Sequence, residues 1–425
     1  LNPQQRQAVD TIDGPVFVMA GPGTGKTQIL TLRIAQILQQ GSGIEPENIL
    51  ALTFTNAAAY NMRERLSKII GAQEAYRVYI STFHSFAEDM IKRYSEYFPR
   101  FQDARLVSSV EQIETIEVIA DEKGGEHFSV FKRREGTLNA IVSSIGKIKS
   151  EGFTADEFRV KVQEQFDEEM SSDDITYKRA YGDFKKGDLK PSAVASVTKK
   201  RDKNLALADI YETYECTLRE KRMYDYSDLI LSVVTELNND SLFQTELQEQ
   251  FQYILVDEHQ DTNDGQNAVL HSLITNPVWE GKPNVFVVGD TKQSIFRFAG
   301  ASEKSFVELF STLKDVVTIE LENNYRSHQG VLSRAHSLIS KSEFHKSENE
   351  LSAFFEHKGA VEYREFHNYK TEALYVAQDI KKRVDAGETP REIAVLFRNN
   401  KDAVEIRKLL DVYGVRYQDS TKKNL

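Results

Sequence analysis

The sequence predicts an α/β protein built on a parallel β-sheet with helices on both faces. Short, unbroken apolar runs recur along the chain, and amphipathic helical patterns separate them. A strand that is buried on both faces is apolar at consecutive positions, and parallel strands need helical crossovers. The runs that we interpret as strands are Pro15–Ala20, Ile49–Phe54, Tyr253–Asp257, Val285–Asp290, Val316–Leu321 and Ile393–Phe397.

Length and composition narrow the class of protein. The 425 residues are nearly three times a typical domain of about 150 residues, so we expect two or three domains. With 40% hydrophobic and 28% charged residues, the composition is that of a globular protein rather than a fibrous or disordered one. The net charge of -11 argues against a nucleic-acid coat protein but does not describe local patches.

Cysteine usage and hydropathy predict a cytoplasmic protein that does not enter a membrane. No stretch approaches the roughly 18 uncharged apolar residues that a membrane span needs. The lone Cys216 excludes a disulfide framework and a multi-cysteine metal site. The chain starts at Leu1 without a charged and then apolar leader, so we expect a reducing, cytoplasmic environment.

The first apolar run ends in a glycine-rich loop, residues 20–27 (AGPGTGKT), and a helical pattern follows. Small residues let backbone N–H groups surround a β-phosphate, Lys26 supplies charge to the β- and γ-phosphates, and the Thr27 hydroxyl is a ligand for Mg²⁺. Ala20 stands where the strict pattern has Gly. The strand before the loop and the helix after it favour a phosphate-binding loop over a structural turn.

Between about residues 86 and 210 the strand pattern gives way to polar, helical stretches, which predicts a helical insertion inside the α/β domain. Within it, Lys178–Lys203 holds nine Lys or Arg against three Asp. From the residues alone, such a run fits a solvated loop as well as a surface that binds a nucleic-acid backbone.

Two polar segments follow later apolar runs. Residues 257–261 (DEHQD) place adjacent carboxylates at the carboxyl end of a strand, where α/β sheets bind ligands. Asp257 is suited to hold Mg²⁺, and Glu258 to orient or deprotonate an attacking water. We interpret His259 as a packing residue. An acidic turn alone is common, but together with the phosphate loop it predicts an ATP hydrolysis site.

The second segment is residues 289–298 (GDTKQSIFRF). Gln293 is an uncharged group able to sense a phosphate oxygen. Phe296 and Phe298 flank Arg297, a pattern suited to base stacking. Taken alone, the segment fits packing of both rings in the core at least as well.

The order and spacing of motifs resemble those of UvrD/Rep-type superfamily 1A DNA helicases. The motifs are LNPQQ (1–5), AGPGTGKT (20–27), LTFTNAAA (52–59), STFHS (81–85), DYSD (225–228), DEHQD (257–261), GDTKQSIFRF (289–298), NNYRS (323–327) and IAVLFRNN (393–400). The resemblance implies a RecA-like P-loop NTPase sheet with a helical insertion subdomain and the start of a second RecA-like domain.

The resemblance also implies a division of the chain. We expect the first motor domain in residues 1–88 and 209–302, the helical insertion subdomain in 89–208, and the beginning of the second motor domain in 303–425. Two later motifs of the family, one with a Thr-His-Lys-Gly pattern and one with a second phosphate-contacting arginine, have no counterpart before Leu425. We therefore expect an incomplete motor.

The resemblance assigns nucleotide contacts. Gln5 would read the adenine edge, Tyr325 would stack on the adenine ring, and Arg326 and Gln293 would contact the γ-phosphate. The expected catalytic residues are Lys26, Glu258, Gln293 and Arg326. The expected Mg²⁺ ligands are Thr27 and Asp257. The expected ATP-binding residues are Gln5, Gly21, Gly23, Thr24, Gly25, Lys26, Thr27, Gln28, Tyr325 and Arg326.

The resemblance further implies a track for single-stranded DNA in which bases stack without regard to sequence. Its expected residues are Phe54, Asn56, His84, Phe296 and Phe298. With the family in view, the basic insertion favours DNA binding. Several positions depart from the pattern: Gln28 replaces an Arg that sandwiches the adenine in many members, Ala57 and Asn61 replace a Lys and a Glu, and Ala299 replaces an Arg. Each departure removes a phosphate or DNA contact.

The sequence thus predicts an ATP- and Mg²⁺-dependent helicase or translocase on single-stranded DNA, or on DNA with a 3′ single-stranded tail, with 3′ to 5′ polarity and a role in replication or repair. Three alternatives stay open. They are a helicase subunit of RecB or AddA type with a nuclease elsewhere, a nucleotide- and DNA-binding module without turnover, and a phosphate-loop switch or kinase unrelated to DNA. The motif at Phe54 and the pair Phe296 and Phe298 argue against the last.

Overall fold

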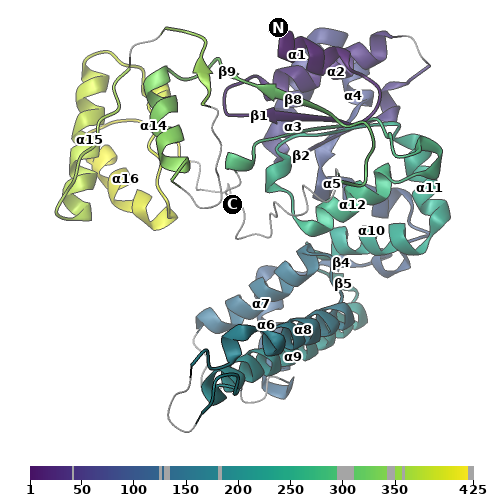
Figure 1. Cartoon of the computed structure of the whole chain (residues 1–425). Coiled ribbons are helices and arrows are strands. Elements are labelled where there is room, and N and C mark those ends of the chain that lie inside the picture. The colour runs from purple at the N-terminus through teal and green to yellow at the C-terminus, as the bar shows by residue number, and fades with distance from the viewer. Residues whose placement is uncertain are drawn as a thin grey trace. The chain divides into compact units, whose positions relative to one another are not determined.

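The structure is a computed structural model that describes residues 1–40, 43–123, 127–128, 135–179, 184–293, 311–341, 350–356 and 359–419. By their internal contacts the residues form two compact units, Leu1–His357 and Lys358–Leu425. Figure 1 shows the helices and strands of both. No helix among the described residues is long and apolar enough to cross a bilayer.

The first unit is built on a parallel six-stranded sheet in the order β3-β2-β6-β7-β1-β8. The strands are β1 (Val16–Ala20), β2 (Ile49–Thr53), β3 (Tyr79–Thr82), β6 (Tyr253–Val256), β7 (Val285–Gly289) and β8 (Val317–Leu321). The predicted parallel sheet is confirmed. The apolar runs identified five of these strands but not β3, which lies at an edge, so only alternate residues of its YIST segment are buried.

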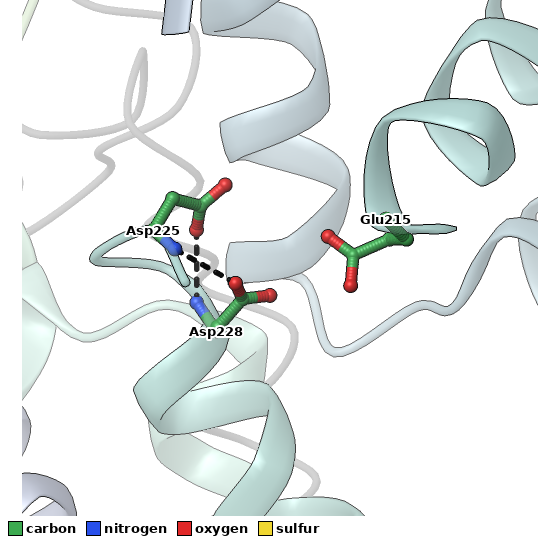
Figure 2. Close-up of side chains that lie close together, drawn as sticks. All are labelled: Glu215, Asp225 and Asp228. Atoms are coloured by element: carbon green, nitrogen blue, oxygen red, sulfur yellow. Dashed lines mark hydrogen bonds between the residues drawn. The ribbon is translucent and has the colours of Figure 1, made fainter. Parts of the chain in front are cut away.

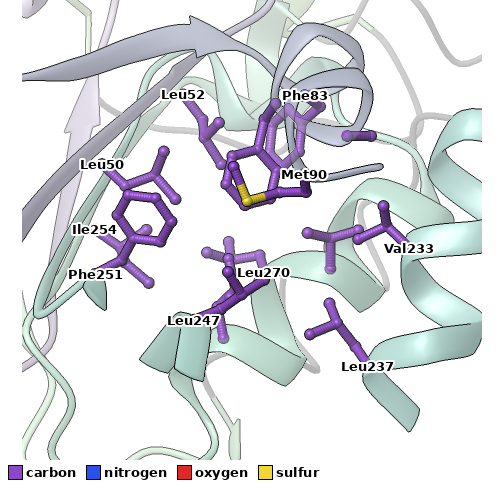
Figure 3. Close-up of a cluster of buried hydrophobic side chains, with 14 of the residues drawn as sticks. Leu50, Leu52, Phe83, Met90, Val233, Leu237, Leu247, Phe251, Ile254 and Leu270 are labelled. Atoms are coloured by element: carbon purple, nitrogen blue, oxygen red, sulfur yellow. The ribbon is translucent and has the colours of Figure 1, made fainter. Parts of the chain in front are cut away.

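Helices cover both faces of the sheet (Figure 1). One face packs against α1 (Pro3–Asp10), α2 (Lys26–Gln39), α3 (Asn56–Ile70) and α4 (Ala72–Arg77). The other packs against α5 (Phe83–Arg93), α10 (Asp228–Asn239), α11 (Ser241–Gln250) and α12 (Asp264–Ile274). Figure 3 shows the second core, with Leu50, Leu52, Phe83, Met90, Val233, Leu237, Leu247, Phe251, Ile254 and Leu270 labelled.

The predicted helical insertion is present. Its helices are α6 (Ser109–Lys123), α7 (Glu135–Ser150), α8 (Ala155–Ser171) and α9 (Pro191–Glu220). A short parallel pair, β4 (Arg105–Leu106) with β5 (Met223–Tyr224), joins the beginning of the insertion to its end. The insertion has its own core, which reaches from Val107 to Met223. Helix α5 packs under the sheet and α9 continues to Glu220, and the limits of 89–208 stay a prediction.

The remaining part of the first unit holds β9 (Asn323–Asn324), α14 (Gln329–Ile339) and β10 (Ser352–Ala353), and β10 pairs with β9. We expected the second motor domain to begin at residue 303, yet β8 pairs with β1 along its whole length.

Short 3-10 helices are η1 (Pro46–Asn48), η2 (Pro99–Phe101), η4 (Asp173–Ile175), η5 (His259–Asp261), η6 (Pro277–Trp279), η7 (Thr291–Gln293), η9 (Pro390–Glu392) and η10 (Asn400–Asp402).

The second unit contains α15 (Tyr369–Asp385) and α16 (Ala403–Val412), which pack through a small core of Ala377, Ile380, Leu410 and Val415. The prediction of a strand at Ile393–Phe397 is wrong: these residues are irregular, and Leu396 is 94% exposed. The described residues of this unit contain no strand with which the segment could pair, so its backbone has no ladder to join.

Candidate functional site

The loop at residues 20–27 leaves the carboxyl end of β1, and α2 begins at Lys26. Gly23 and Gly25 have φ angles of 72° and 92°, a region that glycine enters without steric cost. A Cβ on Gly23 would also lie 2.7 Å from both Arg326 Cβ and Asn324 Nδ2. The glycines are therefore needed both for the shape of the loop and for the close approach of the segment around residue 324.

An ion pair joins this loop to the acidic segment after β6. Lys26 Nζ donates to Glu258 Oε2 at 2.7 Å, and the Lys26 side chain is buried. Glu258 has a left-handed φ of 49°, so the chain turns sharply where β6 ends. Gln260 Nε2 donates to the same Glu258 oxygen at 2.7 Å. The Glu258 carboxylate is thus held by two donors from different loops.

The polar chain continues to β7. Gln260 Oε1 accepts a hydrogen bond from the Asp290 backbone N–H at 2.9 Å. Gln293 follows in η7 and donates from Nε2 to Asp290 Oδ2 at 2.7 Å. Because β6, β7 and β1 are neighbours in the sheet, side chains that are far apart in sequence meet at one edge. The structure thereby brings Lys26, Glu258 and Gln293 into one connected group.

Asp257 is buried at the end of β6. Burial, followed by the charge of Glu258, raises the pKa of Asp257 to about 6, although Lys26 opposes the shift. A buried carboxylate and the half-buried Thr27 hydroxyl are oxygen ligands of the kind that Mg²⁺ prefers, and a divalent cation would relieve the repulsion between Asp257 and Glu258. The donor chemistry of these two residues fits Mg²⁺.

Helix α1 carries Gln5 to the phosphate loop. Asn2 and Gln5 form a capping box, and Gln5 Nε2 donates to the Thr24 carbonyl at 2.8 Å. At the other end of α1, the Arg33 guanidinium donates to three backbone carbonyls, those of Ala8, Thr11 and Ile12. Arg33 therefore fixes α1 to α2.

Arg33 is a residue that sequence reasoning missed. Its guanidinium lies 4.2 Å from the Phe286 ring centroid, and burial lowers the pKa of Arg33 to about 9. The available signal was a charged residue on the apolar face of the helix after the phosphate loop.

The segment 324–327 lies on the phosphate loop. The Tyr325 N–H donates to the Gly23 carbonyl at 2.8 Å, and the Asn324 side-chain amide donates to the Pro22 carbonyl. Asn324 Oδ1 accepts from the N–H groups of Arg326 and Ser327 at 2.8 and 2.7 Å. The buried Asn324, which sequence reasoning also missed, thus shapes the turn that presents Tyr325 and Arg326.

Tyr325 connects this segment to the amino-terminal helix. Its hydroxyl accepts a hydrogen bond from Asn2 Nδ2 at 3.1 Å, and its ring lies 4.7 Å from that of Phe354. Gln5 and Tyr325, the two residues expected at the adenine, therefore both form hydrogen bonds with Asn2. Gln28, the position that departs from the family pattern, is exposed at the start of α2.

The residues expected to contact DNA follow two other strands of the sheet. Phe54 and Asn56 come after β2, and His84 comes after the neighbouring β3. Phe54 is half-buried, and Asn56 lies exposed in the first turn of α3. His84 stacks on Tyr226, with ring centroids 4.3 Å apart and an interplanar angle of 13°. Phe296, Phe298 and Ala299 lie outside the described residues.

The DYSD motif forms an acidic cluster with Glu215. Figure 2 shows Asp225 and Asp228 joined by reciprocal hydrogen bonds, each backbone N–H donating to the other carboxylate at 2.8 and 3.0 Å. One carboxylate oxygen from each of the three acids lies within 4.8 Å of the other two. Carboxylates at this spacing could bind a metal ion, so their counter-charges decide what the cluster does.

Lys149 fills the centre of this cluster. Its ammonium group donates to Asp225 at 2.7 Å and to Asp228 at 2.8 Å, and it also pairs with Glu215. Burial alone would lower the pKa of Lys149, but the three carboxylates together raise it well above its usual value. Arg100 adds ion pairs to Glu215 and Asp228 at 2.9 and 3.1 Å. The cluster is a buried ion network that ties α7 and α9 of the insertion to α10.

Comparison with known proteins finds two family matches. Residues 1–314 match the family described as UvrD/REP helicase N-terminal domain, and residues 319–423 match the UvrD-like helicase C-terminal domain. Similar relatives include proteins named ATP-dependent DNA helicase PcrA from several bacteria. That of Staphylococcus epidermidis is 30% identical over 94% of this chain and 48% of its own length. That of Bacillus subtilis is 29% identical over 98% and 50%. The chain spans about half the length of the curated relatives it matches.

Proposed function

The chain belongs to the UvrD/REP helicase family, and from this membership we propose that it binds and hydrolyses ATP in order to move along single-stranded DNA. The observation that carries the proposal is the ion pair between Lys26 and Glu258. It joins the glycine-rich loop after β1, which is able to surround phosphates, to the Glu258 carboxylate after β6, which is able to act on water. Both strands belong to the same sheet.

The ion pair suggests how binding prepares hydrolysis. The γ-phosphate of ATP would compete with Glu258 for the Lys26 ammonium group. Lys26 would then neutralise phosphate charge, and Glu258, still held by Gln260, would accept a hydrogen bond from the attacking water. Thr27 and Asp257 would hold Mg²⁺, which would supply positive charge to the phosphate oxygens.

Coupling to DNA would use the same edge of the sheet. Arg326 approaches the phosphate loop through the turn shaped by Asn324, and the expected DNA contacts follow β2 and β3. Gln260 links the acidic segment to the loop after β7, which leads to the segment containing Phe296. A change at the γ-phosphate would therefore reach the DNA track through neighbouring loops. The polarity of 3′ to 5′, the preference for a 3′ tail and a role in replication or repair are proposed on the family resemblance.

Steady-state ATP hydrolysis with and without oligo(dT) tests the proposal. We expect hydrolysis that needs Mg²⁺ and rises with single-stranded DNA, and unwinding of a 3′-tailed duplex in preference to a 5′-tailed one. An unchanged hydrolysis rate with and without DNA would overturn the helicase proposal. Stoichiometric nucleotide binding without turnover would instead favour a binding module.

A further inference from the structure

The short strand β10 brings Leu351 against the phosphate loop and Phe354 against Tyr325. We propose that Phe354 forms, together with Tyr325, the surface on which the base of the nucleotide stacks. The proposal rests on the proposed function, because it assumes that the phosphates of ATP bind the loop at residues 20–27. It adds to that function a residue that recognises the base.

Leu351 lies directly on the first glycine of the phosphate loop. A Cβ on Gly21 would be 2.5 Å from Leu351 Cδ1 and 3.2 Å from Cδ2, so only a residue without a side chain leaves room for this leucine. Phe354 follows three residues later, which places its Cα within about 11 Å of that of Leu351 even in a fully extended chain. The segment 351–354 therefore borders the place where a nucleotide would bind.

The rings of Phe354 and Tyr325 pack on each other. Their centroids lie 4.7 Å apart, and their planes are inclined by 40°. A base held between two rings would need centroids about 7 Å apart, twice the contact distance of about 3.5 Å, so the two rings form one continuous aromatic surface instead. Phe354 is 57% exposed and Tyr325 is half-buried, which leaves part of this surface available to a further planar group.

Hydrogen bonds hold the backbone around Phe354 in place. The Phe354 N–H donates to the Asn324 carbonyl at 2.8 Å, which continues the pairing of β10 with β9. The Gln329 side chain accepts a hydrogen bond from the Ala353 N–H at 2.8 Å and donates one to the Leu351 carbonyl at 3.1 Å. Since the strand is fixed before a base arrives, stacking would remove little backbone freedom, which favours binding.

The side chains beside Tyr325 suit a base rather than a phosphate. The Asn2 amide donates to the Tyr325 hydroxyl at 3.1 Å, and the Gln5 amide donates to the backbone of the phosphate loop at 2.8 Å. Amides and aromatic rings offer hydrogen bonds and planes without charge, whereas Lys26 offers charge to the phosphates. The contribution of Phe354 to binding should therefore depend little on salt.

Tyr76 provides a control within the same unit. Its side chain is 64% exposed, and the Arg63 guanidinium lies 5.5 Å from its ring centroid. Tyr76 lies in α4, which precedes β3, whereas the phosphate loop follows β1. Because the strands are parallel, Tyr76 is at the opposite edge of the sheet from the loop. Phe354 and Tyr76 thus share an exposed ring with a neighbouring π-partner but not the nucleotide site.

The test measures two affinities by isothermal titration calorimetry with Mg²⁺ present, for the unsubstituted chain, Phe354→Ala, Phe354→Tyr and Tyr76→Ala. The ligands are β,γ-imido-ATP, which resists hydrolysis, and inorganic tripolyphosphate, which has no base. We expect Phe354→Ala to weaken binding of the ATP analogue about 5- to 100-fold, because the ring under the base is lost, and to bind tripolyphosphate within about twofold of the unsubstituted chain. Phe354→Tyr keeps a ring and should bind both ligands within about twofold, as should Tyr76→Ala.

The outcomes separate the two proposals. If the unsubstituted chain binds the ATP analogue and Phe354→Ala binds it equally well, the assignment of Phe354 is wrong while ATP binding stands. Equal losses for the analogue and for tripolyphosphate would show that Phe354 shapes the phosphate loop, and tighter binding of the analogue would show that its ring stands where the base must bind. Either result overturns the assignment. If the unsubstituted chain binds neither ligand, both proposals fail.

Discussion

Lys26 and Glu258 are 232 residues apart in the sequence, yet Lys26 Nζ lies 2.7 Å from Glu258 Oε2. The ammonium group that should neutralise phosphate is thus already paired with the carboxylate that should act on water. Nucleotide binding must exchange one negative partner of Lys26 for another. After the exchange, the Gln260 amide still donates to the Glu258 carboxylate.

Substitution of Glu258 should separate ATP binding from hydrolysis, whereas substitution of Lys26 should impair both. Glu258→Gln keeps the size of the side chain but cannot take a proton, so we expect near-normal ATP affinity with hydrolysis reduced about 10²- to 10⁴-fold. Lys26→Ala removes phosphate charge and should abolish both. Filter binding of labelled ATP and phosphate release measure the two quantities. The exposed Lys92→Ala serves as a control, since the Lys92 ammonium group forms an ion pair with Glu88, one turn away on the surface of α5. Full hydrolysis by Glu258→Gln would remove Glu258 from the mechanism.

Asp257→Asn should remove the dependence of nucleotide binding on Mg²⁺. The amide keeps an oxygen that can accept the Glu258 N–H but loses the charge that a divalent cation needs. We expect Mg²⁺ to raise the melting temperature of the nucleotide-bound unsubstituted chain relative to EDTA, and to have little effect on Asp257→Asn. Differential scanning fluorimetry checks this without reliance on activity. An undiminished Mg²⁺ effect in the variant would place the ion elsewhere.

His84 should make the fold sensitive to acid. Its folded-state pKa of about 4 is below the ordinary value of 6.5, so between these pH values the unfolded chain binds a proton that the folded chain does not. The free energy of unfolding should therefore fall as the pH is lowered from about 6.5 to about 4. His84→Phe keeps a ring against Tyr226 but has no proton to bind.

The difference in unfolding free energy between His84→Phe and the unsubstituted chain should be constant above about pH 7 and should grow in favour of the variant, by about 1–3 kcal/mol, towards pH 4. Urea unfolding at a series of pH values measures it. A difference that does not vary with pH would show that His84 does not titrate in this way.

Lys149→Met should destabilise the first unit strongly. The substitution leaves three buried acids, of which Glu215 and Asp228 still pair with Arg100, whereas Asp225 loses its ion pair. Removal of one partner from a buried ion network costs about 3–5 kcal/mol, because the remaining charges lose their compensation. Lys147→Met is the matched control, since Lys147 is exposed on the same helix and its replacement should change stability by less than about 0.5 kcal/mol. Similar unfolding free energies for the two variants would contradict a structural role of the network.

Gly23→Ala should impair nucleotide binding by displacing Arg326 and Asn324, which a new Cβ would meet at 2.7 Å. Gly14→Ala is the control, because Gly14 has a similar φ of 79° but no atom within 4 Å of its would-be Cβ. Both variants should lose about 1–2 kcal/mol of stability from backbone strain. We expect only Gly23→Ala to lose ATP affinity, by at least about tenfold, measured by titration with a fluorescent analogue. Equal ATP affinities of Gly23→Ala and Gly14→Ala would show that the segment at Asn324 can move away from the new Cβ without weakening nucleotide binding.

The sheet was predictable from sequence because most of its strands are apolar at consecutive positions. The phosphate loop and the acidic segment were recognisable because the residues of each motif are adjacent in the sequence. The strand β3 was not predictable from an apolar run, because it lies at an edge of the sheet and only its alternate residues are buried. The prediction of a strand at residues 393–397 was wrong because an apolar run indicates side chains suited to burial in a strand. It does not indicate whether a neighbouring strand is present to form backbone hydrogen bonds.

The roles of Arg33, Asn324 and Lys149 were not predictable for a related reason. Each donates to backbone carbonyls or carboxylates that are distant in sequence, as Lys149 does to Asp225 and Asp228. A single polar residue in a helical or loop pattern does not indicate which distant residue it will contact. What identifies these residues is burial together with hydrogen bonds to distant partners, and both arise only when the chain has folded.

The sheet order also determines when the phosphate loop can form during synthesis. Val16 of β1 pairs with Phe286 and Val317, so the strand that precedes the loop has neither neighbour until about 270 further residues have left the ribosome. At about 5–20 residues per second, this interval is on the order of tens of seconds. Throughout it, β1 is an apolar nascent segment without a partner, while the insertion, whose core lies within residues 107–223, can fold first. We therefore expect the helical insertion to be protected from proteolysis on the ribosome before the glycine-rich loop is.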